Sequence, residues 1–378
     1  MTVRRGSIIG AILAASMLPT ACAMPQQPLA EAAAPQQLAI VPSLAAQPQL
    51  SVPPKARRSD YLLVYFKDET HSLYFATSRD GYSFSDVNDG QPVLSGRGIA
   101  EQKGVRDPHI ARGPDGAFYL AMTDLNIFGK RDGTRDTEWQ RPGEKYGWGN
   151  NRKLVLMKSY DLLHWTHAEV DIPATFPAYA DAGSAWAPET IYDPDSGRMM
   201  VYFTTRHGNG PNFLVYSYAN KDFTKLVTSP KRLFRYPDPK VTTIDGDITR
   251  VGDEYHLFYV AHADPLRISQ GVSHDINSGY SFDPAKVDPE PKAAEAPNLW
   301  RRHGTDTYLL MYDVYGASPN NMGFAETTDF KTFRPIGHFN EPGSPMKATN
   351  FSSPKHGAVI AISPVEAKRL ARYFAPRG

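Results

Sequence analysis

The sequence of 378 residues contains one cysteine, Cys22, close to its N-terminus. A single cysteine excludes an intrachain disulfide, and its position leaves the rest of the chain without a cysteine nucleophile or a cysteine metal site. Net charge is also nearly absent, because 41 Lys and Arg residues oppose 40 Asp and Glu residues. A balanced chain lacks the basic field that gathers nucleic acid or anionic lipid. No glycine-rich phosphate loop with a lysine occurs, so we expect a monomer that requires no nucleotide or redox cofactor.

Helical patterns are scarce, whereas residues that form strands and turns are abundant. The chain is 41% hydrophobic, which is enough for a sizeable core, and it has 20 Tyr and 18 Phe residues beside 29 Gly and 32 Pro residues. Aromatic residues favour strands, and Gly and Pro favour tight turns. This composition predicts many short strands joined by turns.

The first 23 residues have the features of a signal peptide. Arg4 and Arg5 form a basic start, residues 7–18 are apolar but too few to span a bilayer, and Ala21-Cys22-Ala23 offers small residues for cleavage. We therefore expect an exported protein, either periplasmic or secreted.

A second interpretation of this segment stays open. Thr20-Ala21-Cys22 is similar to the end of a lipobox, in which case lipidated Cys22 anchors an outer-membrane lipoprotein, although Pro19 stands where that motif prefers an aliphatic residue. Residues 24–58 are rich in Ala, Gln and Pro and predict a linker. The folded domain is then expected at 59–378.

Apolar, aromatic runs of strand length follow the linker, with Gly- and Asp-containing turns between them. The clearest runs are residues 61–66, 118–122, 153–157, 200–203, 255–260 and 308–312. The one convincing helix is the last segment, where Ser363 and Glu366 form a capping box and Pro364 takes the first helical position.

A weak internal repeat organises these strands. Its five copies are Ser78-Arg79-Asp80, Ser159-Tyr160-Asp161, Asn220-Lys221-Asp222, Ser273-His274-Asp275 and Thr327-Thr328-Asp329. Copies about 50 to 80 residues apart are typical of four-stranded blades around an axis. The sequence therefore predicts an all-β fold, a five-bladed β-propeller with a short C-terminal helix.

The inner strand of each blade is expected to begin at a short motif with Pro or Gly. These strands start at Asp107, Trp186, Asp245 and Glu295, and the fifth spans residues 356–362 and completes the blade begun by residues 61–66. A ring closed in this way removes exposed sheet edges.

Three of these starts carry an acid, in Arg106-Asp107-Pro108, Ile244-Asp245-Gly246-Asp247 and Ala294-Glu295-Ala296-Pro297. Inner strands of a propeller converge, so the three carboxyl groups are expected to share one pocket, where repulsion and desolvation raise at least one pKa. A protonated carboxylic acid beside a carboxylate is the pair that glycoside hydrolysis needs. Taken singly, each acid next to Pro or Gly could instead only cap a turn.

The ordered set of blade motifs resembles glycoside hydrolase family 43. The resemblance rests on segments spread over residues 61–362, namely Val105-Arg106-Asp107-Pro108-His109-Ile110, Trp186-Ala187-Pro188-Glu189, Thr243-Ile244-Asp245-Gly246-Asp247-Ile248, Glu295-Ala296-Pro297-Asn298-Leu299 and His356-Gly357-Ala358-Val359. It implies an inverting mechanism in which Asp107 is the general base, Asp245 orients the substrate and modulates the pKa of the acid, and Glu295 is the general acid.

Two departures from the family pattern affect these assignments. Gly246 and a second acid, Asp247, follow Asp245 where the family often has Pro, and strand alternation is expected to place both acids on one face. Ala296 replaces a more frequent Gly. We take Asp245 as the modulator, with Asp247 as the alternative and as a substrate-binding candidate.

Other candidates lie in the same motifs. Trp186 is expected to stack on a sugar ring, Arg106 to orient a substrate hydroxyl or a neighbouring carboxylate, and Glu189 to line the pocket. Blade packing is the alternative for Trp186 and a structural salt bridge is the alternative for Arg106, while Glu189 is not expected to be the general acid. The resemblance also implies that His356 helps to hold a calcium ion or a water cluster near the channel axis. The alternative is that His356 has only a structural role.

The expected activity is hydrolysis of pentosyl residues, α-L-arabinofuranosyl first and β-D-xylosyl next, from plant-type oligo- or polysaccharides. The long insertion at residues 124–151, with Trp139, Tyr146 and Trp148, favours attack at a chain end. A retaining, fructosidase-like propeller enzyme and a non-catalytic carbohydrate-binding propeller remain the alternatives.

Overall fold

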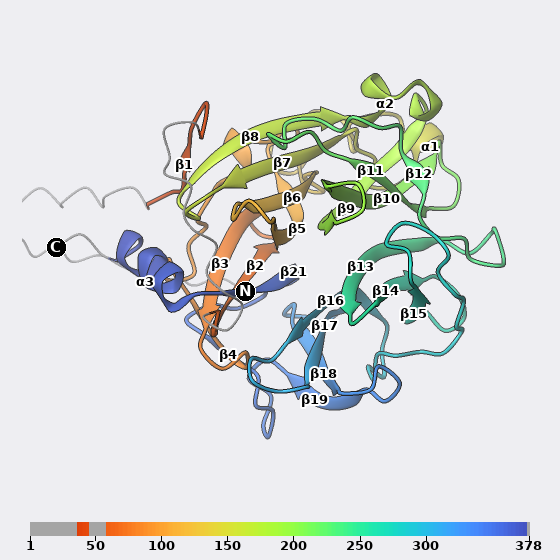
Figure 1. The fold of residues 1–378 in the computed structure, drawn as a ribbon. Helices are drawn as coiled ribbons and strands as arrows, with labels where there is room; N and C mark the ends of the chain where they lie inside the picture. Colours follow the sequence, from red (N-terminus) through yellow and green to blue (C-terminus); the bar gives the residue numbers. More distant parts are fainter. Residues whose placement is uncertain (1–35, 45–57, 376–378) are drawn as a thin grey trace, which may run out of the picture. The chain divides into compact units, whose positions relative to one another are not determined.

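Strands form at the apolar, aromatic runs of the sequence, and they assemble into five sheets (Figure 1). The computed structural model describes residues 36–44 and 58–375. The expected signal peptide, including Cys22, and most of the expected linker lie outside the described residues.

Each sheet is one blade, and its inner strand belongs to a closed ring. The inner strands are β5 (Val105–Arg112), β9 (Ala182–Asp193), β13 (Thr243–Val251), β16 (Ala294–Arg301) and β21 (Lys355–Ile362). Contacts run from β5 to β9, β13, β16 and β21 in turn, and β21 contacts β5 again. The predicted all-β, five-bladed propeller is therefore confirmed.

The other strands follow outward from each inner strand in sheet order. They are β6 (Phe118–Asp124), β7 (Lys153–Ser159), β8 (His164–Asp171) and β1 (Ala39–Ile40) in blade 1; β10 (Arg198–His207), β11 (Phe213–Tyr218) and β12 (Lys231–Arg232) in blade 2; β14 (Glu254–Ala261) and β15 (Arg267–Ser273) in blade 3; β17 (Tyr308–Val314), β18 (Met322–Thr327) and β19 (Arg334–His338) in blade 4; and β2 (Asp60–Lys67), β3 (Ser72–Ser78), β4 (Ser83–Asp86) and β20 (Lys347–Thr349) in blade 5. Short helices are α1 (Gly143–Tyr146), α2 (Ile172–Thr175), η2 (Gly96–Gly98) and η3 (Pro177–Tyr179).

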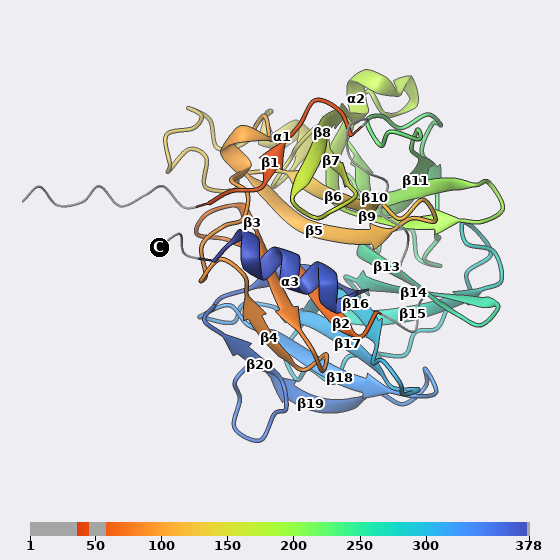
Figure 2. The same cartoon turned by 60° about the vertical axis from the view of Figure 1, so that its left-hand side comes forward.

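The two ends of the folded chain close the ring in blade 5. Strand β21 pairs antiparallel with β2, in a register that places Asp60 opposite Ile362 and Val64 opposite Ala358. Figure 2 shows the C-terminal helix α3 across β2 and β3, and α3 contacts β2. The last strand, β21, therefore completes the blade that begins with β2, as predicted.

The polar turn repeat ends the third strand of each blade. Ser78 ends β3, and its Oγ accepts the N–H groups of Asp80 and Gly81 at 3.3 and 2.9 Å, while Asp80 accepts those of Tyr82 and Ser83. Ser159 with Asp161, and Thr327 with Asp329, make the same bonds. The repeat recurs because the turn after the third strand leaves backbone N–H groups that short polar side chains accept.

The hydrophobic core is divided among the five interfaces between blades. Leu62 and Val64 of β2 belong to the cluster shared with blade 1, whereas Tyr61, Leu63 and Tyr65 belong to the cluster shared with blade 4. Successive side chains of a strand point to opposite faces. A blade is buried on both faces, so its strands are continuous apolar runs.

Helix α3 (Pro364–Tyr373) packs against the closing region and confirms the predicted helix. Ser363 and Glu366 form the capping box, and Glu366 also accepts a bidentate pair of bonds from Arg112 at 2.8 and 2.9 Å. Helix α3 is thereby fastened to β5 of blade 1. Among the described residues, no helix has the length and apolar character needed to cross a membrane.

Part of the segment expected as a linker is packed against blade 1. Ala39 and Ile40 pair in parallel with His164 and Trp165 of β8, and Leu38 is buried. The Ala-, Gln- and Pro-rich composition hides this pairing, because two backbone-paired residues and one buried leucine leave no periodic pattern.

We expect Gly357→Ala to destabilise the protein by about 1–3 kcal/mol, because a Cβ at this position meets the Val64 carbonyl oxygen at 2.2 Å between β21 and β2. Gly98→Ala is the matched control, since its Cβ meets nothing within 4 Å. Denaturant unfolding of both variants measures the difference, and equal stabilities would show that the closing blade yields without cost.

Candidate active site

The inner strands all share one backbone irregularity near their start. A residue with positive φ stands there, at Asp107 (51°), Ala187 (43°), Asp245 (51°), Ala296 (58°) and His356 (20°). At each of these points the pairing with the second strand of the blade shifts register, as in a β-bulge. In every blade the residue before it lines one shared cavity, and in blades 1, 3 and 5 the positive-φ residue itself lines the cavity as well.

In blades 2, 3 and 5, a hydrogen bond from the bulge fastens the blade to a side chain on the second strand of the preceding one. The N–H of Ala187 donates to Thr123 Oγ1 at 2.8 Å, and the N–H of Asp245 donates to Thr204 Oγ1 at 3.1 Å. In blade 5 the N–H of His356 donates to Asp313 Oδ1 at 2.9 Å. The three acceptors lie on the second strand of their blades, so they are equivalent positions of the repeat.

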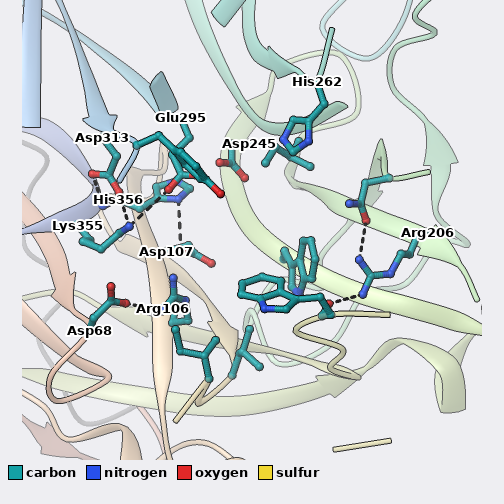
Figure 3. A pocket seen from close by; sticks show the side chains of 17 residues that line it. Asp68, Arg106, Asp107, Arg206, Asp245, His262, Glu295, Asp313, Lys355 and His356 are labelled. Carbon is teal, nitrogen blue, oxygen red and sulfur yellow. Dashed lines mark hydrogen bonds and ion pairs between the residues drawn. The ribbon is translucent and has the colours of Figure 1, made fainter. Parts of the chain in front are cut away.

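The bulges surround a cavity of about 580 Å³. Asp107, Asp245 and Glu295, from blades 1, 3 and 4, all line it, as the sequence predicted (Figure 3). Arg106 and Trp186 line it as well. The structure therefore brings the three acids together at the mouth of the channel.

Asp107 is held as a carboxylate. Thr123 donates to its Oδ2 at 2.7 Å, and His356 Nδ1 lies 3.4 Å from its Oδ1. Burial alone raises the pKa of Asp107, but the hydrogen bond and positive charge of His356, together with Arg106, hold the pKa well below its usual range. Conversely, burial lowers the pKa of His356, and its bond and attraction to Asp107 outweigh this and raise the pKa to about 9. The two groups form an ion pair at neutral pH.

Asp245 has the opposite character. Burial, and then the negative charges of Glu295 and Asp107, raise the pKa of Asp245 to about 7 despite the nearby His356. Its Oδ2 accepts the N–H of Ala296 at 3.3 Å, so Asp245 is tied to the bulge beside Glu295. Glu295 is less buried, and its Oε1 lies 3.4 Å from Lys355 Nζ.

Arg106 is paired with a residue that the motifs did not indicate. Its Nη1 donates to Asp68 Oδ1 at 2.6 Å, and its guanidinium lies 4.5 Å from the ring centroid of Phe66. Arg106 thus lines the cavity, where it was expected to orient a substrate hydroxyl or a carboxylate, and it also forms the ion pair that was its structural alternative.

An aromatic wall lies across the cavity from the acids. Trp186 Nε1 donates to the Gly149 carbonyl at 2.9 Å, and the rings of Trp148 and Trp186 lie 5.8 Å apart. Arg206 stacks on Trp186 at 4.5 Å and donates to the Trp148 carbonyl at 2.6 Å. Trp148 is 58% exposed at the mouth. Trp186 is thus held in place by the insertion that also supplies Trp148.

The long insertion contributes to the cavity in part. Leu125, Ile127 and Trp148 line it, whereas Trp139 packs on Trp148 at 5.4 Å and Tyr146 lies under Arg141 at 4.0 Å. Trp139 and Tyr146 therefore support the wall rather than form it.

Glu189 and Asp247 are not among the residues that line the cavity. Tyr202 donates to Glu189 at 2.9 Å, and the N–H of Leu299 donates to Asp247 at 3.0 Å. The expectation that Asp245 and Asp247 act from one strand face fails, because the bulge at Asp245 interrupts the alternation. Both acids are instead buried where blades 2, 3 and 4 meet.

His109, Glu189 and Asp247 form a buried cluster whose ligand-type atoms lie within 4.8 Å of one another. His109 Nδ1 accepts the N–H of Thr190 at 3.2 Å, so the ring proton of the neutral imidazole is on Nε2, which faces the two acids at 3.9 Å. A protonated nitrogen cannot bind a metal ion. Burial, followed by mutual repulsion, raises the pKa of Glu189 well above its usual range, which favours proton sharing with Asp247 instead.

A calcium ion bound through His356 also does not fit the residues present. Calcium prefers oxygen ligands, whereas His356 offers a ring nitrogen and its Nδ1 lies 3.4 Å from Asp107 Oδ1 in an ion pair. We derive no step of the chemistry through a metal at this position.

The sequence motifs missed several residues that line the cavity. They are Asp68, Arg206, Asn212, His262, Asp313, Tyr315 and Lys355. Lys355 was accessible to sequence reasoning, because it precedes His356 as Glu295 precedes Ala296. Asp313 and Arg206 lie at the ends of second strands, where no motif marks them.

The propeller fold and the acidic cavity together define a class of proteins, the five-bladed propellers in which carboxyl groups from several blades meet at the mouth of the channel. Residues 57–368 match the family described as "Probable glycosyl hydrolase domain", which is related to glycoside hydrolase family 43, and the chain belongs to this family of glycoside hydrolases.

Individual relatives agree with this assignment. The chain is 26% identical over 204 residues to an α-L-arabinofuranosidase of Bifidobacterium longum, a match that covers 47% of this chain and 17% of that protein. It thus spans less than a fifth of that relative. An endo-1,4-β-xylanase structure from Bacteroides thetaiotaomicron aligns with a TM-score of 0.52 at 10% identity, over 74% of this chain and 91% of that one. The family 43 protein BlXynB of Bacillus licheniformis aligns with a TM-score of 0.51 at 15% identity, over 77% and 56%. These two structures share the fold.

We expect His356→Asn to lower stability in a pH-dependent way. The raised pKa of His356 contributes stability that is complete below its unfolded pKa of about 6.5 and is lost as the pH rises through about 9. The lowered pKa of Asp107 contributes stability above about pH 4 that is lost in acid. The difference in Tm between wild type and variant should therefore be largest between about pH 4 and 6.5 and shrink toward pH 9.

His109→Asn provides a control with the opposite slope. Burial, and then the charge of His356, lower the pKa of His109 to about 3, so wild type should lose stability relative to this variant as the pH falls below about 6.5. Parallel slopes for the two variants would rule out the Asp107–His356 ion pair.

Proposed function

We propose that the protein is an inverting, exo-acting glycoside hydrolase that releases α-L-arabinofuranosyl residues, or β-D-xylosyl residues as the second choice, from plant-type oligo- or polysaccharides. The observation that carries the proposal is the convergence of Asp107, Asp245 and Glu295 from three blades on one cavity. The name of the Bifidobacterium relative supports the choice of sugar.

Asp107 takes the part of the general base. A base must be ionised, and the contacts with Thr123 and His356 keep its carboxylate charged and oriented. Its proton acceptance is easier once a bound sugar excludes water, because water no longer stabilises the carboxylate. Inversion requires that a water molecule lies between Asp107 and the anomeric carbon.

Glu295 takes the part of the general acid, and Asp245 that of the modulator. Glu295 is the more exposed of the two, with a side chain 23% accessible, so it can reach the oxygen of a leaving group. Asp245 is buried beside it, and its pKa near 7 lets it exchange charge state as Glu295 gives up and regains a proton.

Shape and wall composition support attack at a chain end. A volume of about 580 Å³ is that of a small-molecule pocket, roughly 300–1,000 Å³, and not of an extended groove. Leu125, Ile127 and Trp148 close one side of it. An apolar sugar face is expected to pack on Trp186, with hydroxyl groups toward the acids.

Parallel assays with 4-nitrophenyl α-L-arabinofuranoside, β-D-xyloside, β-D-galactoside and β-D-fructofuranoside test the proposal. The arabinofuranoside is expected to react fastest. Hydrolysis of the fructoside alone would favour the retaining alternative, and failure with all of these and with arabino- and xylo-oligosaccharides would favour a non-catalytic propeller.

Glu295→Gln should lower kcat on an unactivated disaccharide by about 10²- to 10⁴-fold, because it removes the proton donor and keeps the shape of the side chain. The 4-nitrophenyl glycoside should lose much less, since its leaving group needs little protonation. Glu254→Gln, at a half-exposed position of β14 that does not line the cavity, is the matched control and should leave both rates unchanged. Equal losses on the two substrates would contradict the role of Glu295.

Asp107→Asn should be nearly inactive on both substrates, because water must be activated whatever the leaving group. Proton NMR of the first product formed by wild type should show an inverted anomer, and the Asp107 and Glu295 carboxyl groups should be roughly 6.5–9.5 Å apart in a ligand complex. A covalent adduct on Asp107 after reaction with a fluorosugar would establish a retaining mechanism instead.

A further inference from the structure

Lys355 occupies a position of the repeat that faces the ligand cavity. The residue before each positive-φ residue lines the cavity, and in blade order these residues are Arg106, Trp186, Ile244, Glu295 and Lys355. Arg106 is paired with Asp68, Trp186 and Ile244 form wall, and Glu295 has the role of the acid. Lys355 is the remaining member of the ring, and the proposed chemistry has no use for it so far.

Asp313 stands at the position where blades 1 and 2 have a threonine. In blades 1 and 2 the equivalent acceptors of the bulge N–H are Thr123 and Thr204, and Asp313 Oδ1 performs that task for His356. A hydroxyl suffices for this bond, so the bond does not explain a carboxylate. Asp313 is 2% exposed, and its Oδ2 is buried without a hydrogen-bond partner. A buried carboxylate is costly unless a cation lies beside it.

The cation beside Asp313 is Lys355. Its Nζ lies 3.5 Å from Asp313 Oδ2 and 3.4 Å from Glu295 Oε1, and its side chain is 16% exposed. Charge-assisted hydrogen bonds are usually about 2.7–2.9 Å long. Both contacts are longer than that, so the ammonium group, with three N–H donors, is held by charge and keeps donor capacity toward the cavity.

The neighbourhood of Glu295 indicates which part of a sugar Lys355 can reach. If Glu295 protonates the glycosidic oxygen on C1, then a group beside Glu295 lies next to C1, near either the ring oxygen or the C2 hydroxyl. The ring oxygen becomes positive in an oxocarbenium-like transition state and is repelled by an ammonium group. The C2 hydroxyl accepts a hydrogen bond, and bonds to it strengthen in the transition state.

We propose that Lys355 binds the C2 hydroxyl of the sugar that is cleaved, and that Asp313 is a positioning residue that holds Lys355 beside Glu295. The inference rests on the proposed function. Asp313 has a second effect, because it balances the charge of Lys355 and so reduces the repulsion between the ammonium group and the positive sugar. Other titratable groups that face Glu295 are Arg106, Asp245 and His262, and Asp68 also faces Lys355.

The test compares a 4-nitrophenyl glycoside with its 2-deoxy analogue, using the sugar that wild type cleaves fastest. The kcat/KM of the parent glycoside is divided by that of its 2-deoxy analogue, and this ratio is measured in wild type and in Lys355→Met. Comparing the two ratios cancels the intrinsic reactivity of each substrate. We expect the ratio in the variant to fall by roughly 10- to 100-fold, the value of a hydrogen bond to a charged group. Lys347→Met, an exposed lysine of β20, is the control and should keep the wild-type ratio.

Asp313→Thr tests the positioning role by placing the residue of blades 1 and 2 in blade 4. Its hydroxyl can still accept the N–H of His356, so the fold is expected to survive, as checked by the unfolding midpoint. We expect a lower kcat at a nearly unchanged KM and a reduced ratio for the two substrates. An unchanged ratio and kcat would overturn the role of Asp313, and an unchanged ratio in Lys355→Met would overturn the proposal as a whole.

Binding measurements separate this proposal from the proposed function. Calorimetric titration of Glu295→Gln protein with the parent and 2-deoxy glycosides gives the preference for the hydroxyl without turnover. A preference that disappears in the Glu295→Gln, Lys355→Met double variant supports the role of Lys355. This holds even if wild type hydrolyses none of the substrates, a result that would contradict only the proposed enzyme activity. A preference that persists in the double variant contradicts the role of Lys355.

Discussion

The positive-φ residue at the start of each inner strand is the constraint on which the site depends. Such a conformation is unfavourable for residues other than glycine and persists only when the surroundings fix it. In blades 2 to 5 the N–H of this residue donates a hydrogen bond to a side chain of the preceding blade, as Ala187 does to Thr123, and these bonds help to fix the conformation. The same five bulges turn the flanking side chains toward the axis. Without the bulge, regular strand alternation would point the side chain of Asp107 or Glu295 into the interface between two blades.

Several charged groups at the mouth are arranged as pairs, and pairing together with burial sets the pKa of each acid. Asp68 lies with Arg106, Asp107 with His356 and Asp313 with Lys355. Desolvated charges are tolerated when a partner is close and are costly otherwise. Asp245 is in none of these pairs, and burial, followed by the negative charges of Glu295 and Asp107, raises its pKa to about 7. Burial also raises the pKa of Asp313, to about 6, against the opposing charge of Lys355. The unequal treatment of four neighbouring carboxylates is what separates an ionised base from groups that can carry a proton.

Repetition made most of the fold and half of the site predictable from the sequence. The polar turns and the Pro- or Gly-containing motifs recur because each blade solves the same problem, so the inner strands and the acids Asp107, Asp245 and Glu295 could be placed in advance. Asp247 and Glu189 were misplaced, since the rule of alternation does not foresee a bulge. Asp313 and Arg206 escaped notice because their task depends on contacts between blades, which no local pattern encodes.

Differences among equivalent positions give the cavity its two halves. Blades 2 and 3 present Trp186 and Ile244 in the ring, whereas blades 1, 4 and 5 present Arg106, Glu295 and Lys355. A fivefold scaffold with identical residues would offer a symmetric ring that no sugar matches. A pyranose or furanose has one face poor in hydroxyl groups and an edge rich in them, so an apolar arc opposite a charged arc fixes the orientation of the ring. The backbone repeat thus sets where five side chains meet, and the departure from repetition sets which end of a sugar meets the acids.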